Sequence, residues 1–151
     1  MKVYHLKKQQ YIARPREEVF EFFGKAENLE KITPGSLGFN IITPTPINMR
    51  AGTLIDYTVK PMIFPIRWRT LITDYDPPRR FVDEQLKGPY SFWHHTHTFE
   101  EKDGGTLITD EVRYVIPFGI IGRIAHVLFV KSQLKKIFDF REKVISEIFA
   151  S

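Results

Sequence analysis

A change of hydrophobic period near residue 117 constrains the fold of this chain more than any other feature. Residues 38–116 contain short stretches in which apolar and polar side chains alternate, as in strands that bury one face. Turn-forming residues separate these stretches at 43–46, 50–52, 76–78, 87–89 and 102–105. After Pro117–Gly119 the apolar residues instead recur at steps of three, four and seven, which is the helical period. The pattern predicts about six antiparallel strands followed by one long C-terminal helix.

The first part of the chain adds a strand and two short helices. Residues 3–12 alternate like a strand, and residues 17–23 form a short helical pattern that begins with two acids, as the helix dipole favours. A second helical turn is expected at 28–32. A sheet that curves around the last helix would bury the apolar faces of all these elements. We therefore expect a single α+β domain over residues 1–151: a helix-grip fold with a curved antiparallel sheet around a long C-terminal helix, and two short helices after the first strand.

Composition excludes several function classes. The chain has no cysteine, which rules out disulfides, thiolate catalysis and cysteine-bound zinc. Its net charge of +4 comes from scattered basic residues rather than a dense basic stripe, so no nucleic-acid partner is expected. Aromatic residues make up 14% of the chain, more than a small core needs. This surplus suggests an aromatic lining around a ligand.

The longest apolar run, residues 114–130, is interrupted and too short to span a membrane. The first ten residues do not resemble a secretory signal. We therefore expect a soluble, cytoplasmic protein without stable membrane insertion. Residues 119–130 are apolar nearly all round, which fits either a helix lying on a membrane surface or one buried against the sheet. We favour burial, with Ile124 and Leu128 facing the ligand.

Three of the five histidines lie in F-W-H-H-T-H-T-F, residues 92–99. Because successive side chains of a strand point to opposite faces, His95 and His97 share one face and His94 lies on the other. The face that carries His95 and His97 also carries Trp93, which makes it the better candidate for the core. We expect His95 and His97 to point inward and His94 to face water.

The turn at 102–105 determines how this strand pairs with the next one. Closing the turn there pairs residues whose numbers sum to 207, which places His97 opposite Asp110 and Trp93 opposite Tyr114. A longer loop would turn the charged residues of the second strand inward, at a large cost. We therefore expect His97 and Asp110 to form a buried pair.

His95, His97 and Asp110 together resemble a facial triad of metal ligands. The interpretation we favour is a hydrogen-bonded His–Asp pair that satisfies buried polarity, with His95 completing a polar wall. The chain supplies no recognised metal-binding spacing elsewhere. We therefore expect neither a metal nor a cofactor.

One of the neighbouring acids Asp83 and Glu84 must also face inward if their segment is a strand. Such a carboxyl group would be able to act as an acid or a base. We favour a cross-strand ion pair with Arg67 or Arg69 instead.

Several motifs are spread over nearly the whole chain. They are R-P-R-E-E-V-F-E-F-F (14–23), R-F-V-D-E-Q (80–85), G-P-Y (88–90), W-x-H-x-H-x-F (93–99), D-x-V-x-Y (110–114) and P-F-G (117–119). As a set they resemble the SRPBCC superfamily of START-related helix-grip proteins, and most closely its small bacterial members described as polyketide cyclase/dehydrase-like or ligand-binding. The resemblance implies a curved sheet around a long helix that encloses a hydrophobic cavity for lipids, sterols, quinones or polyketide-like molecules. It does not imply one reaction, because members include transfer proteins, binders and cyclases.

The function we expect is the binding of a hydrophobic or aromatic small molecule, for transport or sequestration. The expected site consists of walls from Trp93, Tyr114, Tyr57 and Trp68, orienting polar groups from His95, His97 and Asp110, and the helix residues Ile124 and Leu128. One alternative is a cyclase or dehydratase in which a His–Asp dyad, drawn from the same three polar residues, removes a proton next to a carbonyl. A second alternative is a protein–protein adaptor that uses the outer sheet or the basic end of the helix.

Overall fold

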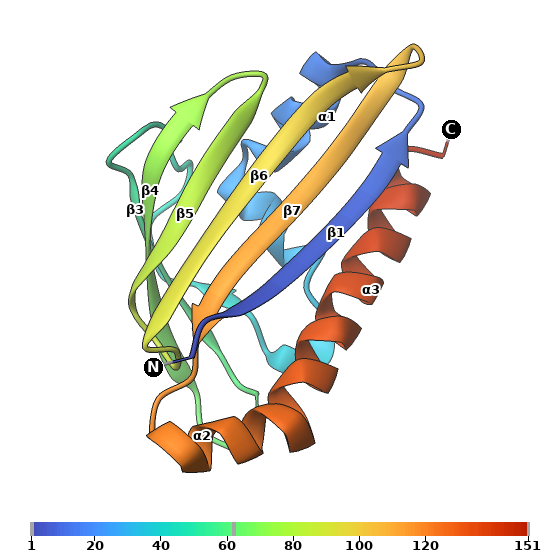
Figure 1. Ribbon diagram of the computed structural model, residues 1–151. Helices are drawn as coiled ribbons and strands as arrows, with labels where there is room; N and C mark the ends of the chain where they lie inside the picture. The colour runs from blue at the N-terminus through green and yellow to red at the C-terminus, as the bar shows by residue number, and fades with distance from the viewer. Residues whose placement is uncertain (1, 62, 151) are drawn as a thin grey trace.

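A computed structural model of the protein, which describes residues 2–61 and 63–150, shows one curved sheet packed against a long helix (Figure 1). The elements in chain order are β1 (Tyr4–Ile12), α1 (Arg16–Phe23), the short 3₁₀ helices η1 (Ala26–Glu30) and η2 (Gly35–Leu37), β2 (Asn40–Ile41), β3 (Leu54–Val59), β4 (Ile66–Asp76), β5 (Arg80–Lys87), β6 (Phe92–Lys102), β7 (Gly105–Val115), α2 (Gly119–Ala125), the π-helical turn η3 (His126–Val130) and α3 (Lys131–Ile148). The predicted α+β helix-grip architecture is confirmed, including the short helices after the first strand.

The sheet has seven strands in the order β1-β7-β6-β5-β4-β3-β2, and every neighbouring pair is antiparallel. Strands β2 to β7 follow one another as a meander, and β1 adds to the far edge beside β7. The predicted register of β6 and β7 is confirmed, with Trp93 opposite Tyr114 and His97 opposite Asp110. Asp103 and Gly104 close this hairpin with positive φ angles of 48° and 77°, as a two-residue turn requires.

The C-terminal helix packs its α3 segment against the concave face of the sheet. Leu134 and Phe138 join a core cluster with Trp93, Val112 and Tyr114. Further along the helix, Ile145 joins a second cluster beneath α1. The apolar residues of α3 thus recur on one face, and this face anchors the helix across the sheet.

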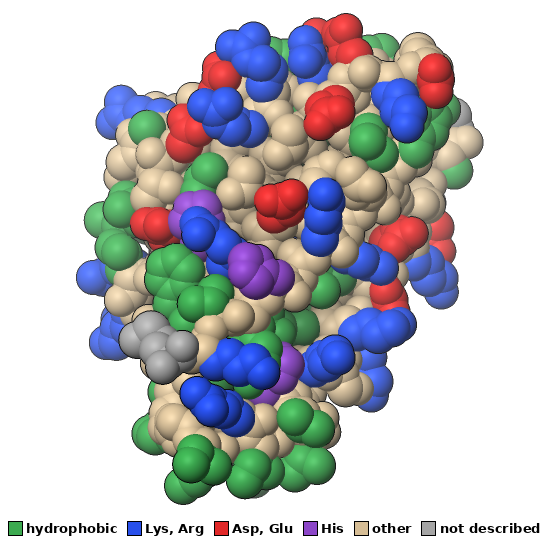
Figure 2. Space-filling model, viewed as in Figure 1, with side chains coloured by type: hydrophobic (Ala, Val, Ile, Leu, Met, Phe, Trp, Pro, Cys, Tyr) green, Lys and Arg blue, Asp and Glu red, His purple; other side chains and the backbone are tan. Residues whose placement is uncertain are grey.

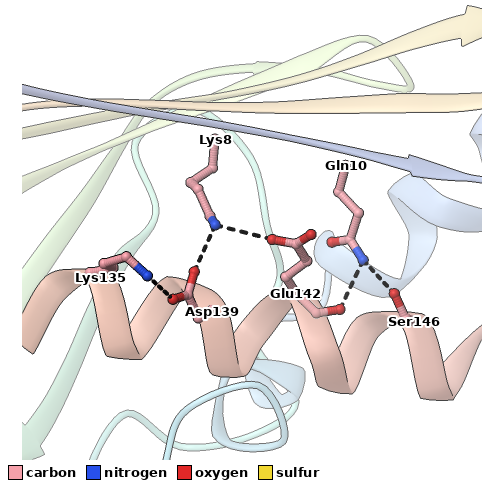
Figure 3. Close-up of polar contacts among 6 residues, drawn as sticks. All are labelled: Lys8, Gln10, Lys135, Asp139, Glu142 and Ser146. Carbon is pink, nitrogen blue, oxygen red and sulfur yellow. Dashed lines mark hydrogen bonds and ion pairs between the residues drawn. The ribbon is translucent and has the colours of Figure 1, made fainter.

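Polar contacts fasten α3 to the edge strand β1 (Figure 3). Lys8 Nζ lies 2.7 Å from Asp139 Oδ1 and 3.1 Å from Glu142 Oε2. Gln10 Nε2 donates to the Glu142 carbonyl at 2.8 Å and to Ser146 Oγ at 2.9 Å. The inner face of β1 therefore changes from apolar to polar where it meets the charged side of α3, and these contacts hold the helix parallel to the edge strand.

The expected burial of residues 119–130 is wrong. Ile120, Ile124 and Leu128 are all more than half exposed, and Phe118 just before α2 is 80% exposed. In Figure 1, α2 lies beyond the ends of the strands and is bent away from α3 at the π-helical turn, so the sheet does not reach far enough to cover it. No helix among the described residues is long and apolar enough to cross a membrane.

Candidate functional site

A cavity of about 450 Å³ lies between the concave face of the sheet, α1 and η1, and the C-terminal helix. This volume is within the range of sites that bind small molecules. Most of its lining side chains are aliphatic or aromatic, contributed by strands β3 to β6 and by all three segments of the C-terminal helix. The curvature of the sheet therefore leaves an apolar space that the helix does not fill.

Four aromatic side chains form one wall of the cavity: Tyr57, Trp68, Tyr90 and Trp93. Tyr57 and Trp68 are directly opposed on β3 and β4, so their rings share a face and stack with centroids 5.8 Å apart. Trp68 packs edge to face against Trp93, with ring centroids 5.4 Å apart, and the ring centroids of Tyr90 and Trp93 are 4.8 Å apart. Burial raises the pKa of Tyr57 and of Tyr90, which keeps both phenols neutral. The wall is aromatic and uncharged.

Two buried histidines and two aspartates form a polar cluster beside this wall. His95 and His97 stack with ring centroids 3.6 Å apart. His95 Nε2 donates to Asp110 Oδ1 at 2.8 Å, and His97 Nε2 donates to Asp83 Oδ2 at 2.6 Å. The remaining contacts are longer: His97 Nδ1 is 3.4 Å from Asp110, and His95 Nδ1 is 3.8 Å from Asp83. Each carboxylate thus touches both imidazoles.

The cluster separates the pKa values of its two histidines. Burial lowers the pKa of His95, and the neighbouring His97 charge lowers it further, against the pull of the two aspartates. Burial also opposes protonation of His97, but its hydrogen bonds to Asp110 and Asp83 outweigh burial and raise its pKa. Burial by itself would raise the pKa of each aspartate, yet the hydrogen bonds from the histidines hold both pKa values below their usual range. Within the cluster, protonation is therefore favoured at His97 and disfavoured at His95.

The structure places five of the predicted ligand-binding residues at the cavity wall, namely Tyr57, Trp68, Trp93, His95 and His97. Asp110 lies behind the wall and reaches the site only through the histidines. Tyr114 is also buried behind it, where its hydroxyl lies 2.7 Å from His126 Nε2. Ile124 and Leu128 are a correction to the predicted site, because they are 55% and 62% exposed and point away from the cavity.

The expected ion pair of Asp83 or Glu84 with Arg67 or Arg69 is wrong. Arg69 and Arg67 instead pair with Asp56, at 2.8 Å and 3.3 Å. Asp83 faces the cavity because it lies two residues after the buried Phe81 on β5, and this alternation was a usable signal.

Arg141 was missed altogether. It lines the cavity from α3, three residues after Phe138 and four before Ile145, so it occupies the apolar face of the helix. A charged residue at that spacing was the signal that the sequence offered.

Asp83, His95 and His97 each offer a donor atom within 4.8 Å of the others, so this group, rather than the predicted set with Asp110, is the one that could hold a metal ion. His97 Nε2 and Asp83 Oδ2 already hydrogen-bond to each other, and His95 Nε2 hydrogen-bonds to Asp110. A metal would have to replace the short contact between His97 and Asp83, and our expectation of no metal stays a prediction.

A family model described as "Polyketide cyclase / dehydrase and lipid transport" matches residues 12–136. The match spans α1, strands β2 to β7 and the C-terminal helix as far as the first residues of α3. The chain belongs to this family. Among curated proteins, none matches the sequence. The resemblance to SRPBCC proteins is thereby confirmed, and family membership supports the binding of hydrophobic molecules in general terms.

Solved structures of low sequence identity share the whole fold. The protein TTHA0849 from Thermus thermophilus is 18% identical and has a TM-score of 0.67, with 96% of this chain and 99% of that chain covered. Ms6760 from Mycobacterium smegmatis is 18% identical, with a TM-score of 0.66 and 98% of both chains covered. The major latex-like protein 151 of Panax ginseng is 12% identical, with a TM-score of 0.70 and 97% of both covered. At these identities the likeness shows the fold alone.

Proposed function

We propose that this member of the family binds a hydrophobic small molecule, such as a lipid, a quinone or a polyketide-like compound, in the cavity between the sheet and the C-terminal helix. The observation that carries the proposal is the cavity of about 450 Å³ with its continuous aromatic wall. An apolar space of this size gains free energy by enclosing apolar surface. The histidines at its edge give a bound molecule a preferred orientation.

Native mass spectrometry of the purified protein, followed by organic extraction, tests this proposal. We expect a co-purified apolar compound, or a rise in melting temperature on adding fatty acids, quinones, sterols or aromatic polyketides. Ile137→Trp, which fills the cavity, should abolish the effect. Ile148→Trp adds the same volume to the same helix away from the cavity and should leave the effect unchanged. An empty protein that responds to none of these compounds would refute the proposal.

A second candidate function rests on the environment of His95. His95 has a lowered pKa and lines a largely apolar cavity, which are properties of a general base that removes a proton next to a carbonyl. A direct test is deuterium exchange at the acidic C–H bonds of 2-tetralone in D₂O, followed by NMR. Catalysed exchange that is lost in both His95→Ala and His97→Ala would support a cyclase or dehydratase. Exchange that survives either change would remove the His–Asp cluster from the chemistry.

A further inference from the structure

Arg141 is a buried cation without a partner in the described chain. Only 9% of the residue is exposed, and it lines the cavity from the inner face of α3. Its Nε is buried without a hydrogen bond, and no ion pair joins its guanidinium to any described acid. Its Cζ lies 5.0 Å from the centroid of the Phe138 ring, which offers no hydrogen-bond acceptor oxygen. Buried donors almost always have an acceptor, so this site lacks a component.

The acidic cluster does not supply that acceptor. His97 and His95 bind Asp83 Oδ2 and Asp110 Oδ1, and no hydrogen bond or ion pair among the described residues joins either carboxylate to Arg141. A ligand that brings a neutral oxygen to Arg141 adds no net charge to the site.

A second hydrogen-bond donor in the aromatic wall also has no acceptor among the described residues. The indole Nε1 of Trp68 is buried without a hydrogen-bond partner, although its ring packs against Tyr57 and Trp93. Both unpartnered donors belong to residues that line one apolar cavity. A purely aliphatic ligand would leave both unsatisfied, whereas an oxygen acceptor would satisfy at least one.

We infer that the ligand is an apolar molecule with an oxygen acceptor, a carbonyl or a carboxylate, and that Arg141 donates to this oxygen. This inference rests on the proposed function and narrows its ligand class. Arg141 presents a fork of N–H donors, which suits both oxygen types. A carbonyl adds no charge to the cavity, whereas a carboxylate would pair its negative charge with the guanidinium.

Titration with dodecanoic acid, 2-dodecanone and dodecane, followed through the fluorescence of Trp68 and Trp93, tests the inference. These are the two tryptophans of the chain, and both line the cavity. Arg141→Met should weaken binding of the acid and the ketone by about 10- to 100-fold and leave dodecane unchanged, because a hydrogen bond to a charged donor is lost. Arg141→Lys keeps the charge and should recover part of the loss for the acid.

The controls separate this inference from the proposed function. Melting temperatures establish that each variant is folded. If all three probes bind and Arg141→Met changes none of their affinities, the assignment of Arg141 fails while cavity binding stands. If Ile137→Trp leaves binding of all three intact, the cavity is not their site and both proposals fail. Wild-type protein that binds none of the three would overturn the inference, whereas the proposed function would still be decided by quinones, sterols and aromatic polyketides.

A second inference comes from an independent feature, the apolar surface formed around α2. Its members are more than half exposed, which is unusual for a contiguous patch on a monomer. They are Phe118, Ile120, Ile121, Ile124, Val127, Leu128 and Phe129. Figure 2 shows hydrophobic side chains gathered at the lower end of the molecule, where α2 lies in Figure 1, with Lys and Arg side chains bordering them.

The charge around the apolar surface is of one sign. Residues 112–138 contain five basic residues and no acid. Arg123 and Lys131 are exposed within or next to the apolar stretch. A second copy of the chain would bring the same positive charge against this border, whereas anionic lipid headgroups would be attracted to it. A lipid bilayer also accepts apolar side chains that project beyond the fold.

The apolar surface is continuous with the cavity. Phe118 and Ile121 both line the cavity and are 80% and 73% exposed. On the connection between β3 and β4, Pro61 lines the cavity too, and Ile63 and Phe64 are 71% and 76% exposed. Exposed apolar residues of both segments therefore adjoin the cavity, which gives an apolar ligand a route between the cavity and a bilayer.

We propose that the apolar surface docks on an anionic lipid bilayer. Sedimentation with phosphatidylcholine vesicles, with and without about 30 mol% phosphatidylserine, tests it. We expect binding to the anionic vesicles that weakens with added salt. Leu128→Asp should lower this binding about tenfold or more, because a charge replaces an inserted apolar side chain. Leu86→Asp is the matched control, since Leu86 on β5 is 55% exposed against 62% for Leu128.

Three outcomes would overturn the docking proposal. The first is wild-type protein that does not sediment with anionic vesicles, and the second is equal binding by Leu128→Asp and Leu86→Asp. The third is a dimer, detected by light scattering, that Leu128→Asp dissociates, which would make the apolar surface an interface between copies.

Discussion

Asp83 hydrogen-bonds to His97, although the strand register places it opposite His95. The Asp83 Oδ2 to His97 Nε2 distance is 2.6 Å, whereas Asp83 to His95 Nδ1 is 3.8 Å. Asp110 shows the reverse exchange, since it lies opposite His97 but makes its shorter contact with His95. The predicted His97–Asp110 dyad is therefore part of a four-residue unit in which each carboxylate bridges two stacked imidazoles.

The first prediction concerns the coupling between Asp83 and His97. Asp83→Asn and His97→Phe should each lower the free energy of unfolding by about 3–5 kcal/mol, because each leaves a buried partner uncompensated. The double mutant should lose about 1–3 kcal/mol less than the sum of the single losses. Urea unfolding near pH 6 measures all four proteins. Losses that add fully would show that the two side chains do not interact.

The second prediction concerns pH, where the two histidines act in opposite directions. The raised pKa of His97 gives stability that is present below about pH 6.5 and lost as pH rises through the folded value. The lowered pKa of His95 costs stability as pH falls below about 6.5. The loss of unfolding free energy caused by His97→Phe should thus be larger near pH 6 than near pH 8.5. The loss caused by His95→Phe should instead be smaller near pH 6 than near pH 8.5.

The aspartates set the acid limit of the same window. Their lowered pKa values give stability that is present above about pH 3.9 and lost as pH falls through the folded values. Urea midpoints at several pH values for the wild type and both histidine variants provide the measurement. Identical pH profiles for the two variants would contradict the assigned protonation states.

The third prediction concerns the anchor of the π-helical turn. Burial lowers the pKa of His126, as do Lys131 and Lys2, so its neutral Nε2 accepts the hydroxyl proton of Tyr114 at 2.7 Å. Tyr114→Phe should lower the unfolding free energy by about 1–3 kcal/mol, because it leaves a buried acceptor without a donor. Tyr11→Phe removes an exposed bond to the Asp103 carbonyl and should cost much less. Equal losses would mean that the bond to His126 does not hold the turn.

The fourth prediction concerns the contact between α2 and the end of β7. A Cβ atom on Gly122 would lie 2.0 Å from the Pro117 carbonyl oxygen. Gly122→Ala should therefore displace α2 and lower the unfolding free energy by about 1–3 kcal/mol. Gly35→Ala, where an added Cβ meets nothing within 4 Å, is the control. Thermal unfolding of both variants checks it, and a Gly122→Ala protein as stable as the control would contradict this packing.

The fifth prediction concerns metal. Because a metal at Asp83, His95 and His97 would have to replace the 2.6 Å hydrogen bond between His97 and Asp83, protein purified without an affinity tag should contain less than stoichiometric zinc, iron or copper. Elemental analysis measures this directly. Stoichiometric metal that disappears in His95→Ala would show that the cluster is a metal site.

Local sequence patterns were sufficient to predict the helices and strands and the pairing of β6 with β7. Alternation assigned His95 and His97 to the inner face, and the Asp103–Gly104 turn fixed the register of β6 and β7. Both are short-range properties: the side-chain period of a strand is two, and a two-residue turn closes in one way. The same local rules placed Trp68 and Tyr57 on a shared face.

Long-range geometry decided the rest. The sequence alone determined an antiparallel sheet, a long C-terminal helix and an inward pair of histidines. Only the tertiary structure decided that Asp83 from β5 completes the polar cluster and that Arg141 from α3 faces the same cavity. It also decided that Leu128, on the π-helical turn η3, is exposed rather than buried. Periodicity says which residues share a face, but the curvature of the sheet and the direction of the helix decide what that face meets.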